Sequence, residues 1–258
     1  MPGLKLLGLG LACLAIHMAL VTAGFDVYWC GTEDYIVYGS IWKKIAYYYI
    51  SVTGQRIMYY VPWYIIDGAI TIVGLTFNGT DAKTREPLWD RIFSVNAFYV
   101  EFSSNPMEIM TYWNHNTHLW LKRYVQERVV APGEKTNLTA TFIVFTVSAL
   151  WHGFYPFYYF MFFMCGFMVE LAKDVYRSRI LFSWVPYPKI VCHFLVMIIL
   201  NYLGTSFMLL TFERGFNFGK ATNFFVFASL PVLMLIVKFS GIVQLAKKAE
   251  EKKKVKSN

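Results

Sequence analysis

The sequence is poor in charged residues. Asp, Glu, Lys and Arg together make up only 16% of its 258 residues, whereas 57% are hydrophobic and 19% are aromatic. Soluble globular domains carry about 25% charged residues, so this composition argues against a soluble fold. We therefore expect an integral membrane protein.

The sequence also lacks the motifs of several enzyme classes. It contains no Walker loop and no HExxH, GxSxG or GxGxxG pattern, which leaves no basis for phosphoryl transfer, zinc proteolysis, hydrolase chemistry or dinucleotide binding. The net charge is +8, but no basic stripe accompanies a soluble fold, so we do not expect a nucleic-acid partner. The charge is better explained by membrane orientation and by attraction to anionic headgroups or substrates.

Metal and disulfide chemistry have little support. The four cysteines show no CxxC spacing and are interpreted as small buried hydrophobic residues: Cys13, Cys30, Cys165 and Cys192. His115 and His118 are three residues apart, but no third ligand lies nearby, so we expect polar histidines at an interface and no metal site.

The hydrophobic residues fall into long runs. A helix crosses the hydrocarbon core with about 20 apolar residues, and runs near this length occupy 4–24, 35–53, 57–77, 138–151, 154–172, 190–212 and 223–241. The run at 4–24 is interpreted as a first span and not as a cleavable signal peptide. We predict an all-α polytopic membrane protein with about six or seven spans, together with interfacial or re-entrant helices.

Three of these runs contain features that refine the prediction. Lys43 and Lys44 interrupt 35–53, which is either a span or an interfacial helix whose lysines reach the membrane surface. Asp67 lies inside 57–77 and should point towards protein or a watery cavity. The short run 138–151 and its successor should be two helices that meet at a break after His152.

Between residues 78 and 137 the chain becomes more polar, and we predict amphipathic helices there. A helix starting near Pro106 would place four residues on one face: Trp113, Thr117, Trp120 and Tyr124. Asn114, His118 and Leu121 would line the adjoining face.

Orientation follows from the basic residues. The tail 246–258 holds six lysines against two glutamates, and a cytosolic tail places 78–137 and 173–189 in the cytosol and His152 towards the lumenal half. The sequons at Asn78 and Asn137 should then remain unglycosylated. The last residues, KVKSN, fit either an endoplasmic-reticulum retrieval signal or a merely basic tail.

The residues alone leave the reactive groups open. His152 lies among aromatic residues and is either a catalytic base or a satisfied histidine at a helix end. Asn114 by itself is more typical of a cap or turn.

Two long motifs change this interpretation. WNHNTHLWLKRYVQERV, starting at Trp113, and SALWHGFYPFYYFMF, starting at Ser148, resemble the paired signature of the membrane-bound O-acyltransferase family, in particular its lysophospholipid acyltransferase branch. QRIMYYVPWYIIDG, GLTFNG and LWDR match the same branch in order and spacing. The resemblance extends from about Arg56 to Pro186, so we describe 1–245 as a partial membrane domain of this family with its core at 56–186, followed by the tail 246–258.

The resemblance implies acyl transfer from acyl-CoA to the free glycerol hydroxyl of a lysophospholipid. Together with the KVKSN tail, this leads us to expect a multi-pass enzyme of the endoplasmic-reticulum membrane. His152 would be the general base, and Asn114 would orient His152, donate to the carbonyl oxygen or hold the acceptor. The expected partners are lysophospholipid, acyl-CoA as co-substrate and membrane lipids, with no bound cofactor. No oligomeric state is indicated.

The resemblance also suggests residues that contact substrate: Trp113, Thr117, Trp120, Lys122, Arg123 and Trp151. Lys122 and Arg123, with Arg128, would either meet the CoA phosphates or form a solvated basic face. The resemblance further implies that the spans and the interfacial or re-entrant helices enclose a catalytic tunnel. Trp113 and Trp120 would wall this tunnel or simply pack, as aromatic stripes at helical spacing more often do.

Two departures from the family pattern stand out. Phe157 occupies the position after the WHGxxP proline where the family usually has glycine, which should alter a close approach or an acyl pocket. The resemblance covers only the C-terminal half of a typical member, so we expect either a truncated sequence or helices supplied by another chain. The alternative functions are acylation of a sterol, a diacylglycerol or a protein, and an inactive or transporter-like half-chain that binds lipid.

Overall fold

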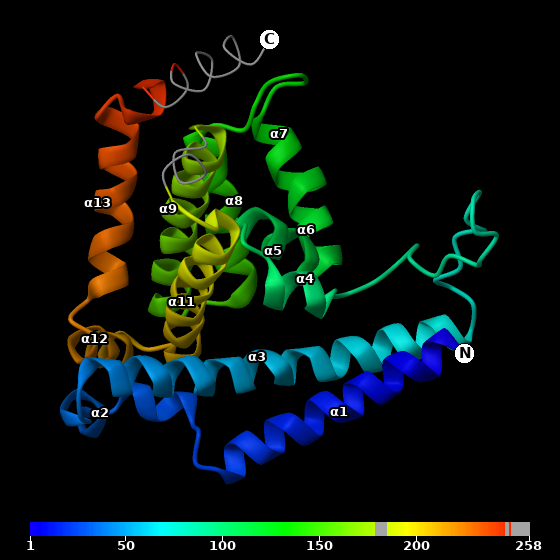
Figure 1. The fold of residues 1–258 in the computed structure, drawn as a ribbon, viewed down its shortest axis with the longest axis horizontal. Coiled ribbons are helices and arrows are strands. Elements are labelled where there is room, and N and C mark those ends of the chain that lie inside the picture. Colours follow the sequence, from blue (N-terminus) through cyan, green and yellow to red (C-terminus); the bar gives the residue numbers. More distant parts are fainter. Residues whose placement is uncertain (179–184, 246–247, 249–258) are drawn as a thin grey trace.

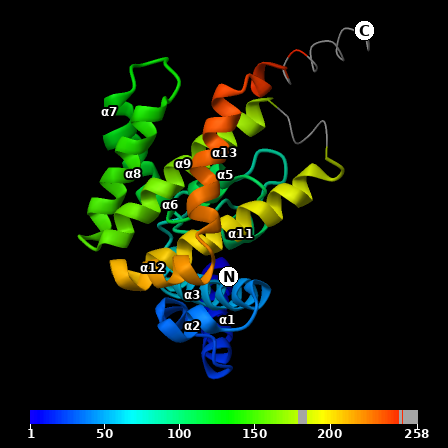
Figure 2. The same cartoon turned by 90° about the vertical axis from the view of Figure 1, so that its left-hand side faces the viewer.

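The computed structural model describes residues 1–178, 185–245 and 248. Helices dominate this part of the chain, and its only pairing of extended segments is an isolated bridge between Thr80 and Pro87. The helices α1 (Pro2–Thr22) and α3 (Ile41–Ile72) lie side by side as a basal layer (Figure 1). Above this layer stand α8 (Leu138–His152), α9 (Pro156–Ser178), α11 (Pro188–Leu209) and α13 (Phe225–Phe239), as Figure 2 also shows.

Fewer membrane spans are found than predicted. By length and composition, α1 and α11 are candidate spans in the described residues, and α12 (Phe212–Ala221) with α13 gives a third if this pair, bent by 82°, counts as one. The predicted count of six or seven is therefore not confirmed. The shortfall has physical causes, because α8 has only 15 residues and the second half of α9 carries Glu170, Lys173 and Asp174.

The runs 35–53 and 57–77 do not form two separate helices. After η1 (Val27–Gly31) and α2 (Glu33–Val37), a single helix of 32 residues, α3, covers most of both runs and continues through Pro62. Gly54 lets α1 approach, because a Cβ there would lie 3.0 Å from the Leu20 side chain. Packing against α1 thus keeps this stretch helical, although its glycine and proline are typical of helix breaks.

Lys44 also differs from the prediction. Its side chain does not reach a membrane surface but is buried, and its Nζ donates a hydrogen bond of 2.6 Å to the carbonyl oxygen of Ile36. Asp67, in contrast, points inward as predicted, with 3% of its surface exposed.

The predicted helix from Pro106 through Tyr124 is wrong. The segment forms short helices instead: α4 (Ala97–Phe102), α5 (Pro106–Tyr112), α6 (His115–Leu121), the π-helix η2 (Lys122–Gln126) and α7 (Glu127–Val129). Asn114 separates α5 from α6 with a φ of 46°, a left-handed conformation that asparagine tolerates better than most residues. Trp113 and Thr117 therefore do not share a continuous helix face.

The predicted break after His152 is confirmed. α8 ends at His152 and α9 begins at Pro156, and Gly153 between them has a φ of 127°. The tail 246–258, except for Lys248, and Arg179 lie outside the described residues, as does the segment 179–184 of the predicted family core.

Candidate active site

His152 lies half-buried at the end of α8, inside a cage of aromatic rings. The ring centroids lie 4.7 Å from Trp151, 5.0 Å from Phe162, 5.1 Å from Phe207 and 5.7 Å from Tyr158. No hydrogen bond joins the imidazole to any of the described residues. Its ring nitrogens are therefore not engaged by the described residues and are available to a bound substrate.

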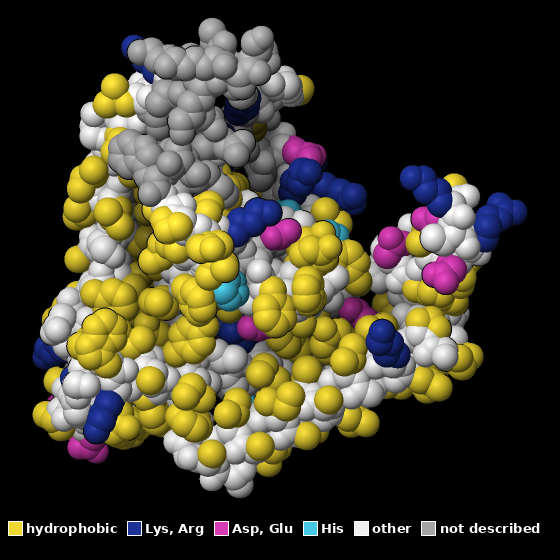
Figure 3. Space-filling model, viewed as in Figure 1, with side chains coloured by type: hydrophobic (Ala, Val, Ile, Leu, Met, Phe, Trp, Pro, Cys, Tyr) yellow, Lys and Arg dark blue, Asp and Glu magenta, His cyan; other side chains and the backbone are white. Residues whose placement is uncertain are grey.

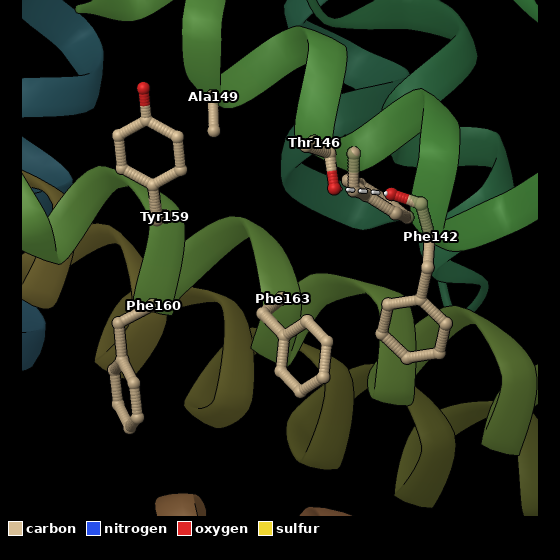
Figure 4. A pocket seen from close by; sticks show the side chains of 7 residues that line it. Phe142, Thr146, Ala149, Tyr159, Phe160 and Phe163 are labelled. Carbon is tan, nitrogen blue, oxygen red and sulfur yellow. Dashed lines mark hydrogen bonds between the residues drawn. The ribbon is translucent and has the colours of Figure 1, made fainter. Parts of the chain in front are cut away.

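An apolar cavity opens one helical turn before His152. It has a volume of about 330 Å³ and lies between α8 and α9, and its lining is mostly aromatic: Phe142, Phe145, Thr146, Ala149, Tyr159, Phe160 and Phe163. Figure 4 shows Thr146 and Ala149 on one helix and Tyr159, Phe160 and Phe163 on the neighbouring one, with the Tyr159 side chain directed towards the helix of Ala149. The Thr146 hydroxyl donates a hydrogen bond of 2.8 Å to the carbonyl oxygen of Phe142 within α8. The lining therefore presents few free polar groups, which suits an apolar chain.

Asn114 occupies a turn that other residues hold firmly. Its carbonyl oxygen accepts the His118 N–H at 3.0 Å, and the N–H of the next residue, His115, donates to the carbonyl oxygen of Ser94 at 2.8 Å. Ser94 in turn is bound by Asp67 of α3, whose two carboxylate oxygens accept the Ser94 N–H at 2.8 Å and its hydroxyl at 2.7 Å. The Asn114 side chain itself makes no hydrogen bond among the described residues.

Asn114 immediately precedes α6, and His152 is the last residue of α8. No hydrogen bond joins the two side chains within the described residues, and they lie at the ends of different elements. Their neighbourhoods are connected because α5 packs against α9 and η2 packs against α8. The two residues therefore belong to elements that pack together in one part of the fold.

The predicted substrate-contacting tryptophans differ in their surroundings. Trp113 packs against three rings of α3, with centroid distances of 4.9 Å to Trp63, 5.7 Å to Tyr59 and 5.9 Å to Tyr60. This favours the packing interpretation for Trp113. Trp120 and Trp151 are 46% and 57% exposed, which leaves them available to a ligand or to lipid.

The polar candidates lie on and after α6. Thr117 is half-buried, whereas Lys122, Arg123 and Arg128 are exposed and make no ion pair among the described residues. Burial, with the nearby positive charges of His115 and Lys122, lowers the pKa of His118 below its ordinary value. Within the described chain no three His, Cys, Asp or Glu side chains gather closely enough to hold a metal ion.

The sequence analysis did not predict a buried ionic network around Arg56. The Arg56 guanidinium donates to both oxygens of Glu101 at 2.7 Å and also to Asn201, and the Tyr60 hydroxyl donates to Glu101 at 2.5 Å. Burial alone would raise the pKa of Glu101, but the hydrogen bonds and positive charge of Arg56 outweigh it and hold that pKa below its usual value. The one available signal was a pair of charges within aromatic surroundings at 56 and 101.

Much of the molecular surface suits a lipid environment. Figure 3 shows hydrophobic side chains over much of the basal layer and the face above it, with charged side chains on the loop after α3, towards the top and at the lower left end of the basal layer. The exposed residues of α1 include Leu4, Leu11, Ile16 and Met18. Such a surface would be unfavourable in water.

Comparison with known proteins agrees with these features. Residues 15–212, which contain both Asn114 and His152, match the model of the membrane-bound O-acyltransferase family. The chain is 30% identical over 237 residues to lysophospholipid acyltransferase 2 of Arabidopsis thaliana, covering 88% of this chain and 50% of that protein. It is 34% identical over 165 residues to the lysophospholipid acyltransferase of Saccharomyces cerevisiae, covering 63% of this chain and 26% of the yeast protein.

A human relative gives the same picture. Membrane-bound glycerophospholipid O-acyltransferase 2 of Homo sapiens is 28% identical over 242 residues, which cover 91% of this chain and 44% of the human protein. The chain thus spans about half the length, or less, of the curated relatives it matches. Because the family model covers most of the chain and both candidate residues, the chain belongs to the membrane-bound O-acyltransferase family.

Proposed function

We propose that this chain carries the reaction centre of an enzyme that transfers a fatty acyl group from acyl-CoA to the free glycerol hydroxyl of a lysophospholipid. The names of the Arabidopsis and yeast relatives support this acceptor class. The single observation that carries the proposal is the His152 imidazole, which none of the described residues hydrogen-bonds and which lies one turn from an apolar cavity.

The chemistry follows from the thioester. Thiolate is already a good leaving group, so the demanding steps are activation of the hydroxyl and stabilisation of the oxyanion. His152 takes the proton of the glycerol hydroxyl, whose oxygen attacks the thioester carbon. The carbon–sulfur bond then breaks, and the CoA thiolate receives the proton from His152.

The remaining candidates would bind and align the two substrates. The Asn114 amide has no described side-chain partner and could donate to the developing oxyanion, orient His152 or hold the acceptor. Lys122 and Arg123 are free of described ion pairs and suit the CoA phosphates. Thr117, Trp120 and Trp151 would line the path between them, and the cavity of Figure 4 would accept an acyl chain.

We further propose a multi-pass location in the endoplasmic-reticulum membrane. The apolar surface and the net charge of +8 support membrane placement with the basic segments in the cytosol. In this arrangement the protein crosses the membrane about six or seven times and encloses a tunnel, so that acyl-CoA arrives from the cytosol and the lipid from the bilayer.

The acceptor class is tested with one labelled acyl-CoA and a panel of acceptors. Membranes carrying the protein are offered lysophospholipids with different headgroups, a sterol and a diacylglycerol. We expect labelled product only with lysophospholipids. Acylation of the sterol or the diacylglycerol instead would overturn the acceptor assignment, and transfer to none of them would reject the enzymatic proposal in favour of a lipid-binding chain.

A further inference from the structure

The carboxylate of Asp67 lies two hydrogen bonds away from the Asn114 turn. Asp67 is 3% exposed, and both of its oxygens are occupied by one residue, Ser94, through the backbone N–H at 2.8 Å and the hydroxyl at 2.7 Å. The carbonyl oxygen of the same Ser94 accepts the His115 N–H at 2.8 Å. A continuous path of hydrogen bonds thus runs from α3 to the residue that follows Asn114.

The turn at Asn114 depends on such support. Its φ of 46° is a left-handed conformation that asparagine tolerates but that is less favourable than a helical one, so contacts that hold the backbone there stabilise the turn. The Ser94 region supplies two further contacts, since Phe93 stacks on the His115 ring at 4.1 Å and the Asn96 N–H donates to the carbonyl oxygen of Tyr112 at 3.1 Å. The segment 93–96 therefore supports the turn at Asn114, and Asp67 attaches this segment to α3 through Ser94.

The buried carboxyl group of Asp67 has no positively charged partner among the described residues. Neither of the two ion pairs in the described residues involves it, so its buried carboxyl is compensated by hydrogen bonds to Ser94 rather than by a positive charge. Burial of a carboxyl group in this way is unfavourable unless the bonds are well formed. A second carboxylate bound by α3 is Glu101, which pairs with Arg56. Glu101 lies on α4 and is not next to Asn114 in the chain.

We propose that Asp67 is a positioning residue which, through Ser94, fixes the backbone at Asn114 and thereby aims the Asn114 amide at the reacting groups. The catalytic part of this inference rests on the proposed function, whereas the structural part concerns only the turn. Asp67 does not touch substrate in this account.

The test uses Asp67→Ala, which removes both bonds, and Ser94→Ala, which removes only the hydroxyl bond. Thr141→Val is the matched control, because the Thr141 hydroxyl donates to Glu170 at the same 2.7 Å in an equally buried place between α8 and α9. Hydrogen exchange of the amides at 115–119 is compared in the four proteins. We expect faster exchange there in Asp67→Ala, a smaller increase in Ser94→Ala and no change in Thr141→Val.

Kinetics supply a readout that a purely structural role would not affect. Per folded enzyme, Asp67→Ala should lower kcat by about tenfold or more and leave the KM for acyl-CoA within about twofold. Asp67→Asn, whose amide oxygen can still accept the Ser94 N–H, should recover most of the rate. In the Asn114→Ala background, Asp67→Ala should cause no further loss, because the group it positions is already absent.

Two results would overturn the inference: unchanged exchange at 115–119 in both Asp67→Ala and Ser94→Ala, or losses in the double variant that simply multiply. Failure of the proposed function is separately visible. Full activity of Asn114→Ala alone would remove the catalytic role of Asn114, and the exchange data would still decide whether Asp67 holds the turn.

Discussion

Phe157 illustrates how one large residue depends on a missing side chain elsewhere. Its ring is buried, and a Cβ added at Gly215 of α12 would lie only 1.9 Å from that ring. The sequence indicated that Phe157 departs from the family pattern and should alter a close approach. It did not identify the glycine 58 positions later that receives the ring, because the two residues meet only in the folded chain.

We predict that Gly215→Ala lowers stability by about 1–3 kcal/mol, because the added methyl overpacks the contact with Phe157. Thermal unfolding in detergent measures the change. Gly8→Ala is the matched control, since nothing lies within 4 Å of a Cβ at Gly8 of α1. Equal midpoints for the two variants would contradict this account of the contact.

The ion pair of Arg56 and Glu101 makes a second prediction at this scale. Replacing one partner, as in Glu101→Gln, leaves a buried guanidinium without its counter-charge and should cost about 3–5 kcal/mol. The pKa of Glu101 is held below its ordinary 4.5, so the ion pair contributes stability above that pH and loses it as the pH falls through the lowered value.

The pH dependence of unfolding checks this sign. The difference in melting temperature between the protein and Glu101→Gln should be largest near neutral pH and shrink as the pH falls below 4.5. A difference that stays constant or grows on acidification would show that the ion pair is not its source. The sequence shows the two charged residues among aromatic ones but not that they pair, because they are 45 residues apart and belong to different elements.

At the scale of elements, local sequence signals predicted where a helix ends better than where a helix continues without a break. The break between α8 and α9 was predictable because glycine and proline follow His152 within four residues. The long α3 was not predictable, because Gly54 and Pro62 are typical break signals, whereas packing against α1 and α11 keeps the segment helical. The turn at Asn114 was missed because helical spacing of aromatic residues continued across it.

Gly153→Ala tests whether the break positions His152. A φ of 127° is accessible to glycine alone, so the substitution should destabilise the break by about 1–3 kcal/mol and displace His152. Gly79→Ala carries comparable strain, with a φ of 86° in a loop far along the chain from His152. Both variants should have a lower melting temperature than the unaltered protein, but only Gly153→Ala should lose acyl transfer per folded molecule. Loss of activity in both, or in neither, would contradict a positioning role for the break.

At the scale of the whole molecule, composition predicted a helical membrane protein, and the family match agrees with the motifs at 113–129 and 148–162. The count of about six or seven spans is not confirmed in the described residues, because hydrophobic length does not reveal which helices merge or remain short. The orientation is still a prediction, and it makes a specific statement about the two sequons.

Asn78 and Asn137 should carry no glycan when the protein is expressed in cells with an endoplasmic reticulum, because both lie on the predicted cytosolic side. Both residues are exposed, so burial would not explain the absence of a glycan. Glycosidase treatment should leave the electrophoretic mass unchanged, while a co-expressed secreted glycoprotein shows that the modification is active. A glycosidase-sensitive shift at either site would reverse the orientation.

The most direct measurement is acyl transfer from labelled acyl-CoA to lysophospholipid by membranes carrying His152→Ala, at expression equal to the unaltered protein. His17→Ala is the matched control, because His17 binds the Gly54 carbonyl oxygen between α1 and α3 and has no part in the proposed chemistry. We predict a loss of about 100-fold or more for His152→Ala and near-normal transfer for His17→Ala. Undiminished transfer by His152→Ala would contradict the account.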